Sequence, residues 1–258
     1  MSSSALPLLT AFEAIVASRR SAGRFDPSRT VPPALLSRVM AATARSPTGF
    51  NMQPYRVVLV RSPAVREVLS RAMSGRGNAS RVVEAPLTAV FAADLRPLES
   101  MAAVLAVEAA WGGRAGRYLR GMPTDAALLL GGAGTGTGAC SGRSAAGALL
   151  SSVAPGFLPT PPSSVEAWST KAAGLAAMTY MHAAAAAGLA THAMEGLDAH
   201  AVRAACGIPQ RYAIPLVIST GYTLEEEQSV GSSTPRLDMG ELFREDAWET
   251  PWGAGGGA

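Results

Sequence analysis

Residues 46–60 read SPTGFNMQPYRVVLV, a polar loop rich in turn residues that leads directly into an apolar run. The run RVVLV at residues 56–60 is typical of a buried strand. The apolar runs LTAVFA at 87–92 and PLVIST at 215–220 predict two further strands. The amide side chains of the loop could bind the polar edge of a ring, although ordinary turn chemistry also explains these residues.

Helical patterns separate these strands. We predict helices at residues 11–18, 32–44, 62–73 with Ser62 as N-cap, 102–111, 164–190 and 198–207 with Asp198 as N-cap. Four strands or fewer, interrupted irregularly by helices, favour an α+β fold over a doubly wound sheet. Residues 112–156 are rich in Gly, Ala and Ser and lack clear periodicity, so we expect an insertion or lid there.

Composition predicts a single domain over residues 1–258. The chain is 48% hydrophobic and 16% charged, which excludes a disordered chain. So little charge indicates that extra surface is buried at a subunit interface, and we expect an oligomer. The polar tail at residues 223–258 has no core of its own, so it would pack on the neighbouring subunit.

Several partners and locations are disfavoured. The net charge of +3 is scattered, which argues against nucleic-acid binding. Residues 172–194 lack Asp, Glu, Lys and Arg but are mostly Ala, so a buried helix is favoured over a membrane span. Cys140 and Cys206 form neither a disulfide framework nor a metal motif. No secretory signal is legible, and we expect a cytoplasmic protein, with a mitochondrial presequence left open.

Two short motifs carry binding chemistry. SRRSAGRF at residues 18–25 places two arginines and a serine at a helix end, a set that suits a phosphate group. A solvated basic helix end is the alternative. AMEGLD at 193–198 interrupts two helical patterns, and Gly196 in it would allow close backbone approach to a ligand.

The order of these motifs resembles that of the FMN-dependent nitroreductase family. The resemblance runs through SRRSAGRF, ARSPTGFNMQPYRVVLV, NASRVVEAPLTAVFAAD, GLATHAMEGLD, GIPQRYAIPLVISTGY and the late TPRLDMGELF. It implies an α+β homodimer with a central, mostly antiparallel sheet flanked by helices. It also implies two FMN molecules at the subunit interface and C-terminal segments exchanged between subunits.

The resemblance assigns one group of residues to the FMN phosphate. These are Arg19, Arg20, Ser21 and Arg236. The sequence departs from the family where Gly23 occupies the place of a basic residue, and Arg24 next to it is expected to compensate. Ser233 and Thr234 replace a second basic residue before Arg236, and Ala193 replaces a frequent proline.

A second group would contact the flavin ring and the ribityl chain. It consists of Ser46, Pro47, Thr48, Asn51, Asn78, Arg81, Glu195 and Gly196. The resemblance implies that the first four come from the other subunit. It places Asn78 and Arg81 at the ribityl chain and the pyrimidine edge, where a cation stabilises negative charge. Glu195 and Gly196 would offer backbone N–H groups near the flavin N5.

The activity implied is an NAD(P)H oxidoreductase that reduces nitroaromatic or quinone-type acceptors by ping-pong hydride transfer, with no catalytic side chain. Candidates for contact with the small-molecule acceptor are Trp111, Tyr118 and Met194. Two alternatives remain. One is a specialised flavoenzyme for dehalogenation, ring dehydrogenation or flavin fragmentation, and the other is a flavin-binding module without turnover.

Overall fold

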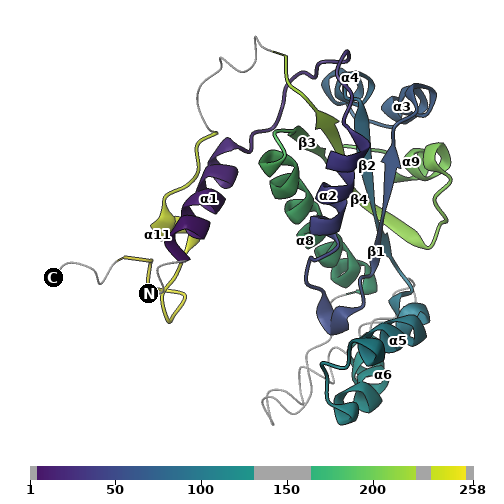
Figure 1. Cartoon of the computed structure of the whole chain (residues 1–258), viewed down its shortest axis with the longest axis vertical. Coiled ribbons are helices and arrows are strands. Elements are labelled where there is room, and N and C mark those ends of the chain that lie inside the picture. Colours follow the sequence, from purple (N-terminus) through teal and green to yellow (C-terminus); the bar gives the residue numbers. More distant parts are fainter. Residues whose placement is uncertain (1–4, 131–163, 225–233, 254–258) are drawn as a thin grey trace.

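The computed structural model describes residues 5–130, 164–224 and 234–253 of the 258-residue chain. Within these ranges one sheet has the strand order β1-β2-β4-β3, and all its neighbouring strands are antiparallel. The strands are β1 (Tyr55–Val60), β2 (Leu87–Asp94), β3 (Ala190–Met194) and β4 (Tyr212–Gly221). Helices cover the sheet, so the predicted α+β class with an antiparallel sheet is confirmed (Figure 1).

Both faces of the sheet are buried, because β2 alternates its side chains between two apolar clusters. Leu87 and Phe91 face the cluster formed with α2 (Pro33–Thr43) and α8 (Val165–Ala186). Val90 faces the cluster formed with α3 (Pro63–Ser70), α4 (Arg76–Glu84) and α9 (Ala199–Cys206). Figure 1 shows the two groups of helices on opposite sides of the sheet. A strand buried on both faces reads as a continuous apolar run, as β2 does.

The helix α8 is the buried element expected from the charge-free segment. Ser164 is the N-cap residue of α8, and its hydroxyl group accepts a hydrogen bond from Ala167 N at 3.0 Å. Alanines on its inner face, such as Ala173 and Ala176, are fully buried and allow close approach to the sheet. Among the described residues, no helix has the length and apolarity needed to cross a membrane.

The predicted helix over residues 164–190 is wrong at its C-terminal end. The helix stops at Ala186, Gly188 adopts a left-handed φ of +70°, and β3 begins at Ala190. The Ala-rich local sequence favours helix, but pairing of β3 with the edge of β4 overrides that preference. Asp198 caps α9 as predicted, accepting hydrogen bonds from His200 N and Ala201 N, and these bonds lower its pKa.

Other features of the structure also differ from the sequence predictions. The helix α6 (Gly116–Leu130) occupies part of the segment for which no periodicity was expected, and residues 131–156 of that segment lie outside the described ranges. The helix α4 was not predicted. Ser62 is the N-cap residue of α3 as predicted, but its side chain makes no capping hydrogen bond, and the helix starts with Pro63, whose ring fixes a helical φ.

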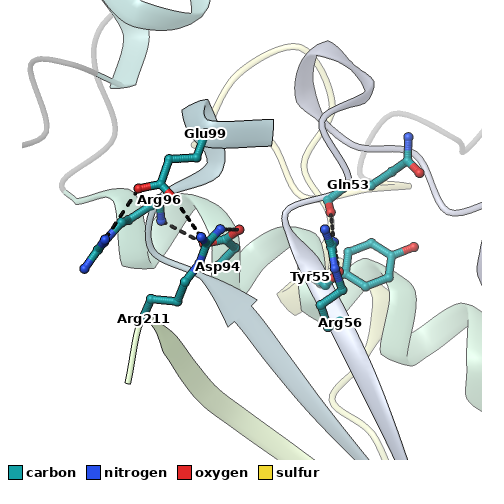
Figure 2. A network of polar contacts seen from close by, with 7 residues as sticks. All are labelled: Gln53, Tyr55, Arg56, Asp94, Arg96, Glu99 and Arg211. Atoms are coloured by element: carbon teal, nitrogen blue, oxygen red, sulfur yellow. Dashed lines mark hydrogen bonds and ion pairs between the residues drawn. The ribbon is translucent and has the colours of Figure 1, made fainter. Parts of the chain in front are cut away.

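An ionic cluster ties the end of β2 to the 3₁₀ turn η2 (Pro97–Ser100), which precedes α5 (Met101–Trp111). Arg211 donates to the buried Asp94 at 2.5 Å and to Glu99 at 2.6 Å (Figure 2). The bond to Asp94 raises the pKa of Arg211 above its ordinary value. The cluster therefore links the turn before α5 to this end of the sheet. In Figure 1, α5 and α6 lie together beyond that end.

Two segments towards the ends of the described chain, α1 (Ala5–Ser18) and the C-terminal segment with α11 (Met239–Leu242), are both drawn away from the sheet in Figure 1. The aromatic ring of Phe12 on α1 contacts His182 on α8 edge-on, with centroids 5.3 Å apart. Large apolar side chains are exposed on both segments, namely Leu6, Leu8, Leu9, Phe12, Val16, Leu237, Met239, Leu242, Phe243, Trp248 and Trp252. An exposed apolar surface of this extent is typical of an interaction site.

The contact between α8 and β4 gives a test of the fold in alkaline solution. Tyr180 is fully buried, its hydroxyl lies 2.8 Å from Thr220 Oγ1, and burial raises its pKa to about 12. An unfolded chain loses the tyrosine proton at about pH 10. The free energy of unfolding should therefore fall as the pH rises from about 10 towards 12.

The variant Tyr180→Phe should lack this part of the alkaline decline, and it should lose about 1 kcal/mol at neutral pH with the hydrogen bond. Urea denaturation at neutral and alkaline pH measures both effects. Thr220→Val is the matched control, because it removes the hydrogen bond but keeps the phenol and so keeps the decline. Equal alkaline slopes in wild type and Tyr180→Phe would contradict the assignment.

Candidate functional site

A cavity of about 430 Å³ opens where α1 ends and β3 begins. It is lined by Ser18, Arg19, Arg20, Ser21, Ala22, Gly23, Ala185, Gly188, Leu189, Ala190, Thr191, Thr223 and Thr234. The structure thus brings the first predicted motif together with the C-terminal end of α8, the start of β3 and one residue beside the late motif. A cavity lined by two arginines and several residues with hydroxyl groups suits an anionic ligand.

The loop that carries the motif SRRSAGRF, called the motif loop below, is fixed by backbone pairing with β3. Ala22 N donates to Thr191 O at 3.0 Å, and Ser21 forms a parallel bridge with the same strand. His192 Nδ1 lies 2.7 Å from Ala22 O. On its other side the loop continues to Asp26, whose N–H donates to Tyr222 O at 2.8 Å, just after β4. The loop is therefore an extension of the sheet edge, and the cavity has a rigid wall.

The electrostatic effect of the motif reaches α8. His182 is partly buried, and burial together with the positive charge of Arg19 lowers its pKa below the ordinary value. A histidine held neutral in this way adds no positive charge of its own at neutral pH. The positive charge offered to a ligand in the cavity therefore comes from the arginines.

The helix α4 holds the motif loop from the other side. Arg81 Nε donates to Gly23 O at 3.0 Å, and its Nη1 donates to Asn78 Oδ1 at 3.3 Å. Gly196 lies next to Asn78, because a Cβ on this glycine would stand 3.5 Å from Asn78 Nδ2 and 3.3 Å from Ser74 Cβ. Ser74 N donates to Gly196 O at 2.8 Å. The predicted residues Asn78, Arg81 and Gly196 therefore gather beside the phosphate motif, and Glu195 is exposed at the same turn.

Arg24 does not line the cavity. Its Nε donates to both carboxylate oxygens of Glu84 on α4, at 2.8 and 3.0 Å, and Glu84 also accepts from Phe25 N. This arrangement orients the Arg24 Nε towards α4, and the expected compensation for Gly23 stays a prediction. Glu84 is a residue that sequence reasoning missed, since nothing in its local sequence distinguishes it.

Arg236 is exposed, and its Nη1 donates to the carbonyl groups of Thr234 and Pro235 at 2.9 and 3.0 Å. Because Thr234 lines the cavity, the start of the late motif reaches the phosphate motif, and Arg236 donates to carbonyl groups of its own segment.

The other four residues of the second predicted group lie at the opposite end of α2. Ser46, Pro47, Thr48 and Asn51 follow this 11-residue helix, whereas the cavity lies before it (Figure 1). Eleven helical residues span roughly 16 Å. Within one chain, therefore, the structure does not bring these four residues to the cavity.

The loop after α2 has an unusual backbone. Phe50, Asn51 and Gln53 adopt left-handed φ values of +53°, +52° and +45°. Residues with a Cβ disfavour this region by roughly 1–2 kcal/mol each. Side-chain bonds offset this cost: Thr48 Oγ1 accepts from Gln53 N at 3.0 Å, and Gln53 Nε2 donates to Asn51 O at 2.8 Å. Strain held in place by such contacts is typical of functional loops.

The three predicted acceptor contacts fall in different places. Trp111 is 68% exposed at the end of α5, and Tyr118 on α6 is 36% exposed, with the guanidinium of Arg114 over its ring at 4.9 Å. Met194, however, is only 2% exposed and packs in the core cluster with Met73 and Val202. Met194 is therefore a core residue in this structure, because its place on β3 turns it towards α9.

A buried carboxylate beside the loop also escaped sequence reasoning. Glu108 on α5 is 3% exposed and accepts a hydrogen bond from Asn51 Nδ2 at 2.7 Å. One signal could have revealed it, since Glu108 is the single charged residue in the otherwise apolar α5 sequence MAAVLAVEAAW.

Relatives of known sequence cover most of the chain. It is 29% identical over 223 residues to an NADH dehydrogenase of Thermus thermophilus, and the matched region covers 86% of this chain and 90% of the relative. It is 26% identical over 234 residues to protein DrgA of Synechocystis, with 90% and 94% covered.

Solved structures share the fold. A nitroreductase family protein from Streptococcus pneumoniae matches with a TM-score of 0.68 at 20% identity, over 91% of this chain and 99% of that one. A protein from Exiguobacterium sibiricum, described as a nitroreductase in complex with FMN, gives 0.69 at 18% identity, over 91% and 96%. A family model described as the nitroreductase family matches residues 16–222, which is well over half of the sequence. The chain therefore belongs to the nitroreductase family.

Proposed function

We propose that the chain is an FMN-dependent NAD(P)H oxidoreductase that reduces nitroaromatic or quinone-type acceptors. The observation that carries the proposal is the cavity at the end of α1, where Arg19, Arg20 and Ser21 offer donors of the kind that phosphate requires. When bound, FMN would supply the redox chemistry, taking hydride from NAD(P)H and passing electrons to the acceptor in ping-pong order.

The chain's own residues would bind and orient the cofactor. Arg19 and Arg20 would neutralise the phosphate, and the loop that carries them is fixed on β3 by Ala22. Arg81, held by its bond to Gly23 O, would place positive charge near the pyrimidine edge. Gly196, whose lack of a Cβ lets its backbone lie close to Ser74 and Asn78, would present its backbone N–H to the reactive edge of the ring. We assign the cytoplasm as the proposed location, because the nicotinamide donors are intracellular metabolites.

A homodimer would complete the site. The loop at Ser46 and Asn51 lies at the far end of α2 from the cavity, so a second copy must supply it if both contact one flavin (Figure 1). The exposed apolar side chains on α1 and α11 supply a surface that such a copy would cover. We infer that residues 223–258 extend onto the partner subunit.

A specialised flavoenzyme is the second candidate. It is favoured by the helices α5 and α6. The helix α5 contacts the loop at Asn51, and the two helices expose Trp111 and Tyr118. Aromatic side chains in this position would select a substrate by its shape and ring system.

Purified protein should show a visible flavin band that NADH or NADPH bleaches under anaerobic conditions and a quinone restores. The reason is that FMN would carry both half-reactions. Turnover of one specialised substrate with negligible quinone reduction would favour the second candidate. A flavin band that neither nicotinamide bleaches would indicate a binding module, and protein that stays colourless after incubation with FMN would refute the proposal.

Arg19→Ala should weaken FMN binding about tenfold to a hundredfold, because a hydrogen bond to a charged phosphate contributes about 1.5–3 kcal/mol. Fluorescence quenching of FMN added to the apoprotein measures the affinity. Arg38→Ala is the matched control, since it removes the same charge from an exposed position on α2 that does not line the cavity. Equal losses in the two variants would show that Arg19 acts only through net charge.

The double variant Leu9→Glu/Phe12→Glu should convert a dimer into monomers in sedimentation equilibrium, because it places charge in the proposed apolar interface. Val68→Glu is the control, an equally exposed apolar position on α3 across the sheet. A wild-type protein that sediments as a monomer would contradict the dimer.

A further inference from the structure

The carboxylate of Glu108 is buried without being part of the main core. It is 3% exposed and stands alone as a charge in the apolar helix α5. Burying a carboxylate is costly unless it is paired and hydrogen-bonded. An acid retained in such a place therefore requires specific partners.

Glu108 has two partners from different elements. Arg114 Nε, just after α5, donates to Glu108 Oε2 at 2.8 Å and supplies the compensating charge. Asn51 Nδ2, from the loop after α2, donates to Glu108 Oε1 at 2.7 Å. The ion pair with Arg114 therefore uses Oε2 of Glu108, and Oε1 accepts the hydrogen bond from the loop.

These contacts fix which way the amide of Asn51 faces. Gln53 Nε2 donates to Asn51 Oδ1 at 3.1 Å, while an ionised Glu108 can only accept from Asn51 Nδ2. Exchanging the oxygen and nitrogen of the amide would put a donor against a donor and an acceptor against an acceptor. The amide keeps one N–H and one lone pair for a ligand, and both have a defined direction.

We propose that Glu108 is a positioning residue that orients Asn51 for the flavin. The inference rests on the proposed function, in which Asn51 lines the ring. Because Asn51 lies at a left-handed φ of +52° between two other strained residues, its loop has little intrinsic preference for this shape. The anchor on α5 supplies that preference from outside the loop.

The test is a double-mutant cycle on FMN affinity, measured by fluorescence quenching with the apoprotein. The variants are Glu108→Gln, Asn51→Ala and their combination. Glu108→Gln can satisfy only one of the two donors with its single carbonyl oxygen, so FMN binding should weaken about tenfold. In the Asn51→Ala background the same change should have less than about a twofold effect, because the residue through which Glu108 acts is gone.

A second variant protects the test against unfolding. Glu108→Asp keeps the charge next to Arg114 but withdraws the carboxylate by one methylene. It should therefore weaken FMN binding when Asn51 is present, and it should have little effect in the Asn51→Ala background. Glu67→Gln is the matched control, because it removes a carboxylate paired with Arg71 on α3, away from α5 and from the cavity, and FMN affinity should not change. The thermal unfolding temperature of each apoprotein separates loss of stability from loss of affinity.

Two results would overturn the inference. One is unchanged FMN affinity in both Glu108 variants, and the other is an equal loss with and without Asn51, which would mean that Glu108 supports the fold and not the orientation of the amide. Either result in a wild-type protein that binds FMN leaves the proposed function standing. Wild-type protein that does not bind FMN would overturn both.

Discussion

The pairing of β3 with β4 is the constraint on which the candidate site depends. It adds a fourth strand to the sheet, and the free edge of that strand then receives the loop after α1 through the bond from Ala22 N to Thr191 O. The arginines of the motif thus stand on a loop whose backbone is hydrogen-bonded to β3 and to Tyr222. Flexible arginine side chains bind an anion more tightly when their backbone is fixed beforehand, because less conformational entropy is lost.

Much of the fold follows from local sequence, and the parts that do not share a physical reason. The strands β1, β2 and β4 are continuous apolar runs, and Asp198 is a strong N-cap, so both are legible. By contrast, β3 has the sequence ATHAM, which carries little strand preference and becomes a strand only because β4 offers an edge. The helix α4 was missed for a similar reason, since Gly77 lies in its first turn and its only buried apolar side chain is Val82.

The site shows the same division. Motifs near each other in sequence, such as the two arginines and Ser21, were predicted together and lie in one cavity. The partners that hold these motifs come from distant elements, as Glu84 does for Arg24, and a single sequence contains no signal of such contacts. The loop at Ser46 and Asn51 illustrates the limit most clearly. The resemblance alone implies that this loop contacts the flavin from the other subunit, and in the folded chain α2 separates it from the cavity.

The region around α5 and α6 has its own small apolar cluster, formed by Met52, Ala126, Leu130 and Trp168 and distinct from the two clusters that flank the sheet. Cooperative unfolding units tend to follow such divisions of the core. The apolar contacts that hold this region are therefore separate from those that hold the sheet and the loop after α1. A chain built in this way can also change the length and sequence of that region over evolution, and so alter what it admits, without losing the framework that holds the anion.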